Sequence, residues 1–295
     1  MNVLVAGGTG FIGRNVCAEL AERGQDVTAL SRDPDPSQLP DDVETAVGDV
    51  SAYDSIEGAF EGQDVVVNLV ALSPLFQPPS GTTHMTVHYG GTENILQAMD
   101  EHDVDRLVHM SALGADPDGD TEYIRAKGLA EELVRDADVE SVIFQPSVVF
   151  GDGGEFVPFA RKLTPGPFVK VLPGGGKTRF QPIHVDDLVP LLADAVEDES
   201  HTGETYEIGG PEVLTLADVT RLAYEANGKS VTIAPVPMPL AKIGLTLAGP
   251  LPFIPMGPDQ ARSLQLDNTT EDNDVTAFDV DPESLTTLQE YLGLA

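Results

Sequence analysis

The first fourteen residues, MNVLVAGGTGFIGR, join a short apolar run to a cluster of glycines and then to a helical pattern. Residues 2–6 have the composition of a buried strand, and Gly7, Gly10 and Gly13 follow with the spacing G-x-x-G-x-x-G. Such glycines allow a tight turn, a close approach by a pyrophosphate and close packing of a helix on a strand. The amphipathic pattern after Phe11 supplies a helix whose first amide groups would hold the pyrophosphate. The stretch predicts a dinucleotide-binding unit, with a purely structural glycine turn as the alternative.

The end of the second predicted strand, residues 26–30, indicates which dinucleotide is bound. NAD-binding units usually carry an acidic residue here for the ribose 2′-hydroxyl. This chain has Ser31 and Arg32 instead, and a hydroxyl beside a guanidinium suits a 2′-phosphate. We therefore expect NADP(H) to be preferred. NAD(H) is the alternative if Arg32 is a solvated loop charge and Asp33 takes the ribose.

The charge balance of the chain is strongly acidic. Lys and Arg number 16 and Asp and Glu number 49, which gives a formal net charge of −33. The acidic residues are spread along the whole length, so an acidic tail or a single acidic patch does not explain them. Molar salt screens such self-repulsion, because it shortens the Debye length to about 3 Å. The composition is typical of a cytoplasmic protein from a salt-accumulating halophile of the haloarchaeal type. We expect no nucleic acid as a partner, because the chain has no basic face to displace the counterions of a nucleic acid.

Cysteine content and hydropathy predict a soluble chain without disulfides. The single cysteine, Cys17, falls in the first predicted helix, where we expect a small core residue. No signal peptide precedes the first strand, and no apolar run has the length of a membrane span.

Short apolar runs alternate with helical patterns along the first half of the chain. Strands are predicted at 2–6, 26–30, 43–47, 64–70, 106–111 and 141–145, and helices at 12–23, 84–101 and 123–136. This alternation is typical of an α/β fold with a doubly wound parallel sheet, the Rossmann arrangement. We expect 1–155 and 183–210 to form the NADP(H)-binding domain. A smaller substrate-side region would comprise 156–182 and 211–295, with a short apolar helix at Leu240–Ala248 inside the Pro-rich stretch 235–258 and a last helix at 282–292.

Tyr123 and Lys127 are four residues apart in the helix predicted at 123–136, so both side chains project from one face. Beside a nicotinamide, the amine can hold the nicotinamide ribose while its charge lowers the pKa of the phenol. The phenol can then exchange a proton with a carbonyl or an alcohol as a hydride moves. The spacing alone is weak evidence, but its place after the fifth strand favours a catalytic pair.

Taken together, these motifs resemble the extended short-chain dehydrogenase/reductase superfamily, which is NAD-dependent epimerase/dehydratase-like. The resemblance also rests on Gly48–Val50, Ser111 at the end of the fifth strand, Gln145–Gly151 and Pro182–Asp187. The stretches Ser111–Ala115 and Pro146–Gly151 are most similar to an atypical subgroup. That subgroup includes the nucleotide-binding accessory subunit of respiratory complex I and its prokaryotic relatives.

The resemblance implies roles for individual residues. Tyr123 would be the acid/base, Lys127 its electrostatic partner and the ligand of the nicotinamide ribose, Ser111 a donor to the substrate oxygen, and Asp49 a ligand of the adenine. The implied cofactor-binding set is Gly7, Thr9, Gly10, Phe11, Ile12, Gly13, Ser31, Arg32, Asp49, Val50, Leu69, Val70, Ala71, Lys127, Pro146 and Val148. No metal site is expected, because His84 and His88, although four residues apart, lack an evident third ligand.

Three functions stay open at this point. The leading one is an NAD(P)-dependent oxidoreductase that transfers a hydride to or from a carbonyl or alcohol. The second is a non-catalytic NADPH-binding accessory or regulatory subunit with a respiratory-complex partner. The third and weakest is a sugar-nucleotide epimerase or dehydratase. Six hydrophobic residues could contact the substrate, which suggests an apolar carbonyl compound, but they suit a hydrophobic core equally well. They are Leu72, Leu75, Phe76, Phe156, Phe159 and Phe180.

Overall fold

The computed structural model describes residues 1–163, 169–236 and 258–294, and the chain forms two compact units. The first unit comprises Met1–Leu72, Pro78–Pro146 and Val185–Glu207, and the second comprises Ser73–Gln77, Ser147–His184 and Ile208–Ala295. The chain passes into the second unit at Ser147, before the boundary that we expected at residue 155. Within the second unit, the Ser147 hydroxyl donates to the backbone oxygen of Asn268 at 2.9 Å.

A seven-stranded sheet forms the centre of the first unit, in the order β11-β6-β5-β4-β1-β2-β3. The strands from β6 to β3 pair in parallel, as the apolar runs predicted. Strand β4 ends at Asn68, earlier than predicted, because Leu69 and Val70 turn into a pocket described below. The seven strands are β1 (Asn2–Ala6), β2 (Asp26–Ser31), β3 (Glu44–Val47), β4 (Val65–Asn68), β5 (Arg106–Met110), β6 (Glu140–Pro146) and β11 (Thr205–Ile208).

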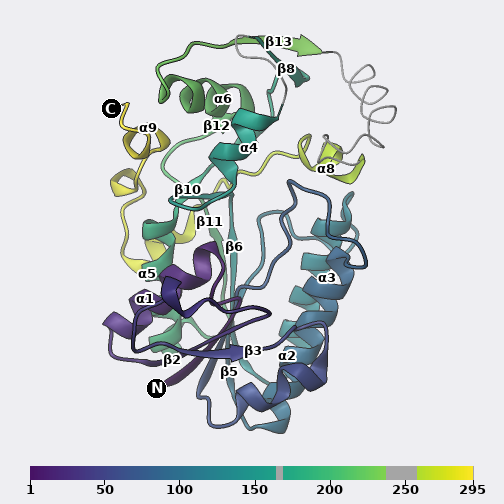
Figure 1. Cartoon of the computed structure of the whole chain (residues 1–295), viewed down its shortest axis with the longest axis vertical. Coiled ribbons are helices and arrows are strands. Elements are labelled where there is room, and N and C mark those ends of the chain that lie inside the picture. Colours follow the sequence, from purple (N-terminus) through teal and green to yellow (C-terminus); the bar gives the residue numbers. More distant parts are fainter. Residues whose placement is uncertain (164–168, 237–257, 295) are drawn as a thin grey trace. The chain divides into compact units, whose positions relative to one another are not determined.

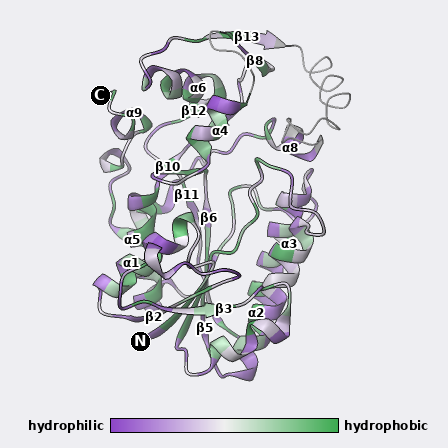
Figure 2. Cartoon of the chain, in the orientation of Figure 1, coloured by the Kyte–Doolittle hydropathy of each residue, from purple (hydrophilic) through white to green (hydrophobic). Residues whose placement is uncertain are grey.

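Helices cover both faces of this sheet, which confirms the doubly wound Rossmann fold (Figure 1). Helices α1 (Phe11–Glu22) and α5 (Val185–Glu197) pack together on one face, and α2 (Gly90–Glu101) and α3 (Glu122–Asp136) on the other. A π-helical turn, η4 (Met85–Tyr89), leads directly into α2. These helices carry both hydrophobic and hydrophilic residues (Figure 2), and their buried hydrophobic side chains belong to the core. The first unit also holds the short 3₁₀ turns η1 (Pro36–Gln38), η2 (Tyr53–Ser55), η3 (Glu57–Phe60) and η5 (Glu199–His201).

The second unit combines three two-stranded sheets with short helices. Strand β7 (Val149–Phe150) pairs with β10 (Ile183–His184), β9 (Arg179–Phe180) with β12 (Leu214–Thr215), and β8 (Val169–Pro173) with β13 (Thr232–Val236). The helices are α4 (Phe156–Lys162), α6 (Leu216–Glu225), α8 (Pro258–Ser263) and α9 (Leu288–Tyr291), with 3₁₀ turns η6 (Asp274–Phe278) and η7 (Pro282–Ser284).

The prediction of one C-terminal helix over 282–292 was wrong. The segment contains η7 and the single turn α9, separated by Leu285–Thr287. Asp281 caps the N-terminus of η7, and Thr287 with Glu290 forms a capping box at the N-terminus of α9. The local side chains therefore favour two short helical turns rather than one continuous helix. Leu285 and Leu288 are nevertheless buried. The helix expected at Leu240–Ala248 lies outside the described residues.

Cys17 is fully buried in α1, where its thiol lies 3.7 Å from the Gly8 carbonyl oxygen. Desolvation raises the pKa of this thiol to about 12, so it is an inert core residue rather than a nucleophile. Within the described parts of the chain, none of the helices is long and apolar enough to cross a membrane.

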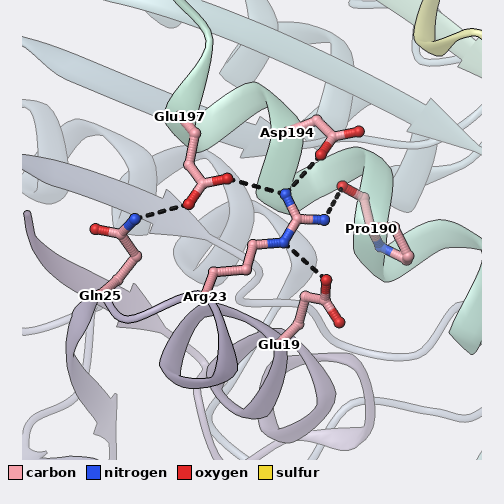
Figure 3. A network of polar contacts seen from close by, with 6 residues as sticks. All are labelled: Glu19, Arg23, Gln25, Pro190, Asp194 and Glu197. Atoms are coloured by element: carbon pink, nitrogen blue, oxygen red, sulfur yellow. Dashed lines mark hydrogen bonds and ion pairs between the residues drawn. The ribbon is translucent and has the colours of Figure 1, made fainter.

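A polar network centred on Arg23 joins the end of α1 to α5 (Figure 3). The guanidinium lies 2.8 Å from Glu19, 2.6 Å from Asp194 and 3.0 Å from Glu197. Gln25 donates to the other oxygen of Glu197 at 2.7 Å. Although partial burial opposes it, hydrogen bonding to three carboxylates raises the pKa of Arg23. In so acidic a chain, Arg23 is the charge that lets these carboxylates lie together.

We expect Arg23→Ala to lower the free energy of unfolding by about 1–2 kcal/mol in dilute buffer, because it removes hydrogen bonds to three charged groups and leaves their repulsion uncompensated. The loss should shrink in molar KCl. Denaturant unfolding at low and high salt measures it. Arg221→Ala is the matched control, since Arg221 is more than half exposed and pairs with Asp218 alone among the described salt bridges. An equal effect of both substitutions would show that the network contributes nothing beyond an ordinary surface pair.

Candidate functional site

The glycine-rich turn after β1 has the geometry of an anion-binding cradle. Gly7 adopts a φ of +85°, and its N–H donates to the Leu30 carbonyl at 2.9 Å. The Gly10 N–H donates to the Gly7 carbonyl at 2.9 Å. A side chain at Gly13 would overlap the Gly7 carbonyl oxygen, so α1 can lie against the turn only because residue 13 is glycine. Helix α1 begins without a side-chain cap or an acidic residue in its first turn, which leaves its amide groups for an anion.

This turn opens into a pocket of about 500 Å³ at the carboxyl ends of β1, β2 and β4. Most of the predicted nucleotide ligands line it: Gly7, Thr9, Gly10, Ser31, Arg32, Asp49, Val50, Leu69, Val70 and Ala71. Phe11, Ile12 and Gly13 lie in the first turn of α1 and are not among the lining residues. Lys127 and Pro146 belong to the same unit without lining the pocket, and the Pro146 oxygen accepts from the Leu113 N–H at 3.1 Å. Val148 belongs to the second unit, where its N–H donates to Asn268.

Four residues that line one part of this pocket were not predicted from the sequence. Gly81, Thr82, Thr86 and Val87 line it from the segment before α2. No motif marks these residues, because they reach the pocket through the tertiary fold alone. Five further lining residues adjoin predicted ones: Leu30, Asp33, Gly48, Ser51 and Leu72.

The pocket contains a hydroxyl, a guanidinium and a carboxylate around the ends of β2 and β3. Ser31 has a buried hydroxyl oxygen without a hydrogen-bond partner in the described residues, and Arg32 is exposed beside it. Partial burial of Asp49 opposes its ionisation, yet hydrogen bonds from Ser51 and the charge of Arg32 lower the pKa of this carboxyl. The pocket thus presents both a cation and a carboxylate to a ligand.

Tyr123, Lys127 and Ser111 all belong to the first unit, where Lys127 reaches the end of β5, one residue before Ser111. Thr121 caps α3 by accepting from the Ile124 N–H at 3.3 Å, which places Tyr123 in the first turn and Lys127 one turn later. The buried Lys127 ammonium donates to the Met110 carbonyl at 2.8 Å, at the end of β5. The next residue, Ser111, has a buried hydroxyl without a partner among the described residues.

The pKa values of the pair are dominated by burial. Desolvation lowers the pKa of Lys127 to about 8, and the charge of Glu131 partly opposes this. Desolvation raises the pKa of Tyr123. Our expectation that Lys127 lowers the pKa of the phenol is therefore not met, because burial dominates and the ammonium donates to Met110.

His84 and His88 lie against Tyr123. Both are buried and stacked on each other at 5.4 Å, and both rings meet the Tyr123 ring edge-on at 5.4 Å. Among the described residues no group of three or more His, Cys, Asp or Glu could hold a metal ion. The ring contacts show that the two histidines pack against the phenol.

Most of the apolar residues that suggested a hydrophobic substrate belong to a core. Phe156, Phe159 and Phe180 are buried in the hydrophobic cluster of the second unit, and Leu75 and Phe76 pack against it. Leu72 lines the pocket of the first unit. Packing accounts for five of the six candidates, so they carry no argument for an apolar substrate.

A parallel doubly wound sheet, a glycine cradle and a pocket at the carboxyl ends of its strands define a dinucleotide-binding protein of the Rossmann class. Residues 7–159 match the NAD(P)H-binding family, to which the chain belongs.

Curated relatives refine this assignment. The chain is 28% identical to NADH dehydrogenase (ubiquinone) 1 alpha subcomplex subunit 9 of Arabidopsis thaliana, over 94% of this chain and 73% of that protein. It is 29% identical to the NADH-ubiquinone oxidoreductase 40 kDa subunit of Neurospora crassa, over 74% of this chain but only 58% of that protein. It is also 29% identical to a 3 beta-hydroxysteroid dehydrogenase/Delta 5→4-isomerase of Mycobacterium tuberculosis, over 77% of this chain and 70% of that protein.

Among solved structures, UDP-glucose 4-epimerase of Thermotoga maritima has the same fold, with a TM-score of 0.74 at 19% identity, covering 100% of this chain and 97% of that one. The predicted resemblance to the extended short-chain dehydrogenases, and within them to the complex I subgroup, is confirmed.

Proposed function

We propose that this protein is an NAD(P)-dependent oxidoreductase of the atypical extended short-chain type, acting on a carbonyl or alcohol. The observation that carries the proposal is the grouping of Tyr123, Lys127 and the unpartnered Ser111 hydroxyl in the unit that contains the nucleotide pocket. A nicotinamide, when bound, supplies or accepts the hydride. Tyr123 would give its proton to the carbonyl oxygen, or take one from the alcohol. Ser111 would orient that oxygen, and Lys127 would hold the nicotinamide ribose through an N–H that is not given to Met110.

The same proposal includes a preference for NADP(H). Ser31 offers a buried hydroxyl and Arg32 a guanidinium where a 2′-phosphate would bind, and the structure has a cradle that suits the pyrophosphate. Asp33 and Asp49 line the same pocket and could instead bind a free ribose hydroxyl, so NAD(H) is the competing ligand. A fluorescence titration of the folded protein with NADPH and NADH, side by side in molar KCl, compares the two directly.

Arg32→Ala should weaken NADPH binding by about tenfold or more, because it removes a charge-assisted contact to the 2′-phosphate. NADH, which lacks that phosphate, should bind with nearly unchanged affinity and is the internal control. A parallel loss for both nucleotides would mean that Arg32 acts on the fold or on the pyrophosphate, and tighter binding of NADH to the native protein would reverse the predicted preference.

The second candidate function is a nucleotide-holding accessory subunit. It is favoured by the similarity to the complex I subunits of Arabidopsis and Neurospora, which extends over most of this chain. In that case NADPH would serve as a folding ligand, stabilising the native state by RT ln(1 + [L]/Kd). NADPH that co-purifies and resists oxidation by every carbonyl tested would favour the subunit, whereas rapid exchange and turnover would favour the enzyme.

We also infer that the protein works in a salt-rich cytoplasm. The net charge of −33 is the support for this, since screening by molar salt reduces the repulsion among its carboxylates. Unfolding midpoints should rise as KCl is increased from about 0.1 M towards 1 M, the range over which the Debye length falls from about 10 Å to about 3 Å.

A further inference from the structure

The first unit contains three buried side chains with nitrogen donors, and one of them, His88, contacts Tyr123. His88 and His109 are each 2% exposed and Lys127 is 1% exposed. Burial and then the charge of Lys127 lower the pKa of both histidines, that of His109 to about 3. Both imidazoles are therefore neutral at ordinary pH, and each carries one N–H. Hydrogen bonds link the two histidines through Asn68, whose amide nitrogen lies 3.2 Å from His109 Nδ1 and 3.3 Å from the Thr92 hydroxyl, and that hydroxyl donates to the His88 carbonyl at 2.7 Å.

The hydrogen bonds decide which nitrogen carries that proton. Asn68 accepts from the Val70 N–H through Oδ1, so its amide nitrogen is the donor to His109 Nδ1 at 3.2 Å. The proton of His109 is then on Nε2. His88 accepts from the Leu72 N–H through Nε2 at 3.4 Å, so its proton is on Nδ1.

These assignments leave donors without acceptors. His88 Nδ1 and His109 Nε2 are both buried with no hydrogen-bond partner in the described part of the chain. Lys127 has three N–H groups, of which one donates to Met110. An unpaired buried donor destabilises the fold, and proteins commonly satisfy such groups with a buried water.

We propose that His88, His109 and Lys127 bind one small acceptor, a water molecule or a chloride ion, and that His88 is thereby a positioning residue for the Lys127–Tyr123 pair. The acceptor would receive the two imidazole N–H groups and steady the ammonium. His88 has a second connection to the pair, because its ring contacts Tyr123. The binding site itself does not depend on the proposed function. Only its effect on catalysis rests on the oxidoreductase activity.

A crystal structure of the full chain grown in KBr tests the site directly. We expect a density peak within about 3.3 Å of at least two of His88 Nδ1, His109 Nε2 and Lys127 Nζ. An anomalous signal would identify a halide, and its absence a water. No peak, or a ring orientation that turns both N–H groups to protein acceptors, would overturn the proposal.

Three variants test the positioning role through kcat and KM. His88→Leu should lower kcat by about 10²-fold with little change in nucleotide affinity, as expected for a small misplacement of a catalytic group. His88→Asn should recover most of this loss, because its oxygen can accept from Leu72 and its nitrogen can donate to the acceptor. His84→Leu is the matched control, since it removes a ring with the same 5.4 Å contact to Tyr123.

Equal losses at His84 and His88, or no recovery with Asn, would show that the rings only pack and would overturn the positioning role. If the native protein turns over no carbonyl at all, the oxidoreductase proposal fails, while the density peak still decides whether the site exists.

Discussion

Tyr123→Phe should remove turnover almost completely while the protein still binds NADPH. The variant keeps the ring that His84 and His88 contact and loses only the hydroxyl, so packing around α3 should be preserved. Loss of a general acid typically costs about 10²–10⁴-fold in rate. The measurement is steady-state oxidation of NADPH with a panel of carbonyl substrates, beside a titration of nucleotide affinity.

The control is Tyr224→Phe, which removes a phenol hydroxyl that donates to the Arg161 carbonyl in the second unit. It should leave turnover unchanged. Full activity in Tyr123→Phe would take Tyr123 out of the mechanism. That result, together with tightly held NADPH, would strengthen the accessory-subunit alternative.

Gly13→Ala is expected to be the most damaging substitution in the nucleotide pocket. Its Cβ would overlap the Gly7 carbonyl oxygen and lie 2.8 Å from the Gly8 Cα, both of which are backbone atoms that cannot rotate away. The strain should lower the free energy of unfolding by about 1–3 kcal/mol and shift the glycine turn. Because the turn forms the anion cradle, nucleotide affinity should fall as well.

Gly58→Ala is the matched control, since a Cβ there meets no atom within 4 Å among the described residues beyond its chain neighbours. Thermal unfolding with and without NADPH compares the two variants. For a chain of this size, about 1 kcal/mol shifts Tm by roughly 2–4 °C. A Gly13→Ala protein with native Tm and native affinity would show that the turn can relax, and the close-approach argument would then be wrong.

Local sequence patterns determined the central fold of this protein. The apolar runs, their alternation with helical patterns and the glycine spacing predicted the parallel sheet and the cradle after β1. Such patterns act over a few residues, because strand burial and glycine turns are properties of neighbouring positions. The turn after β4, at Leu69, Val70 and Ala71, was assigned to the nucleotide site through the resemblance to the extended short-chain dehydrogenases and not through a local pattern.

Only the tertiary structure decided which distant residues meet. Thr82 and Thr86 line the pocket, and His88 lies beside Tyr123 and Lys127, although nothing near them in the sequence marks either role. Phe156 and Phe180, which read equally well as substrate contacts or core, are core residues. These outcomes depend on contacts between elements far apart along the chain and on how burial changes the protonation of the groups brought together. A periodic pattern records which face of an element is buried, but not what that face is buried against.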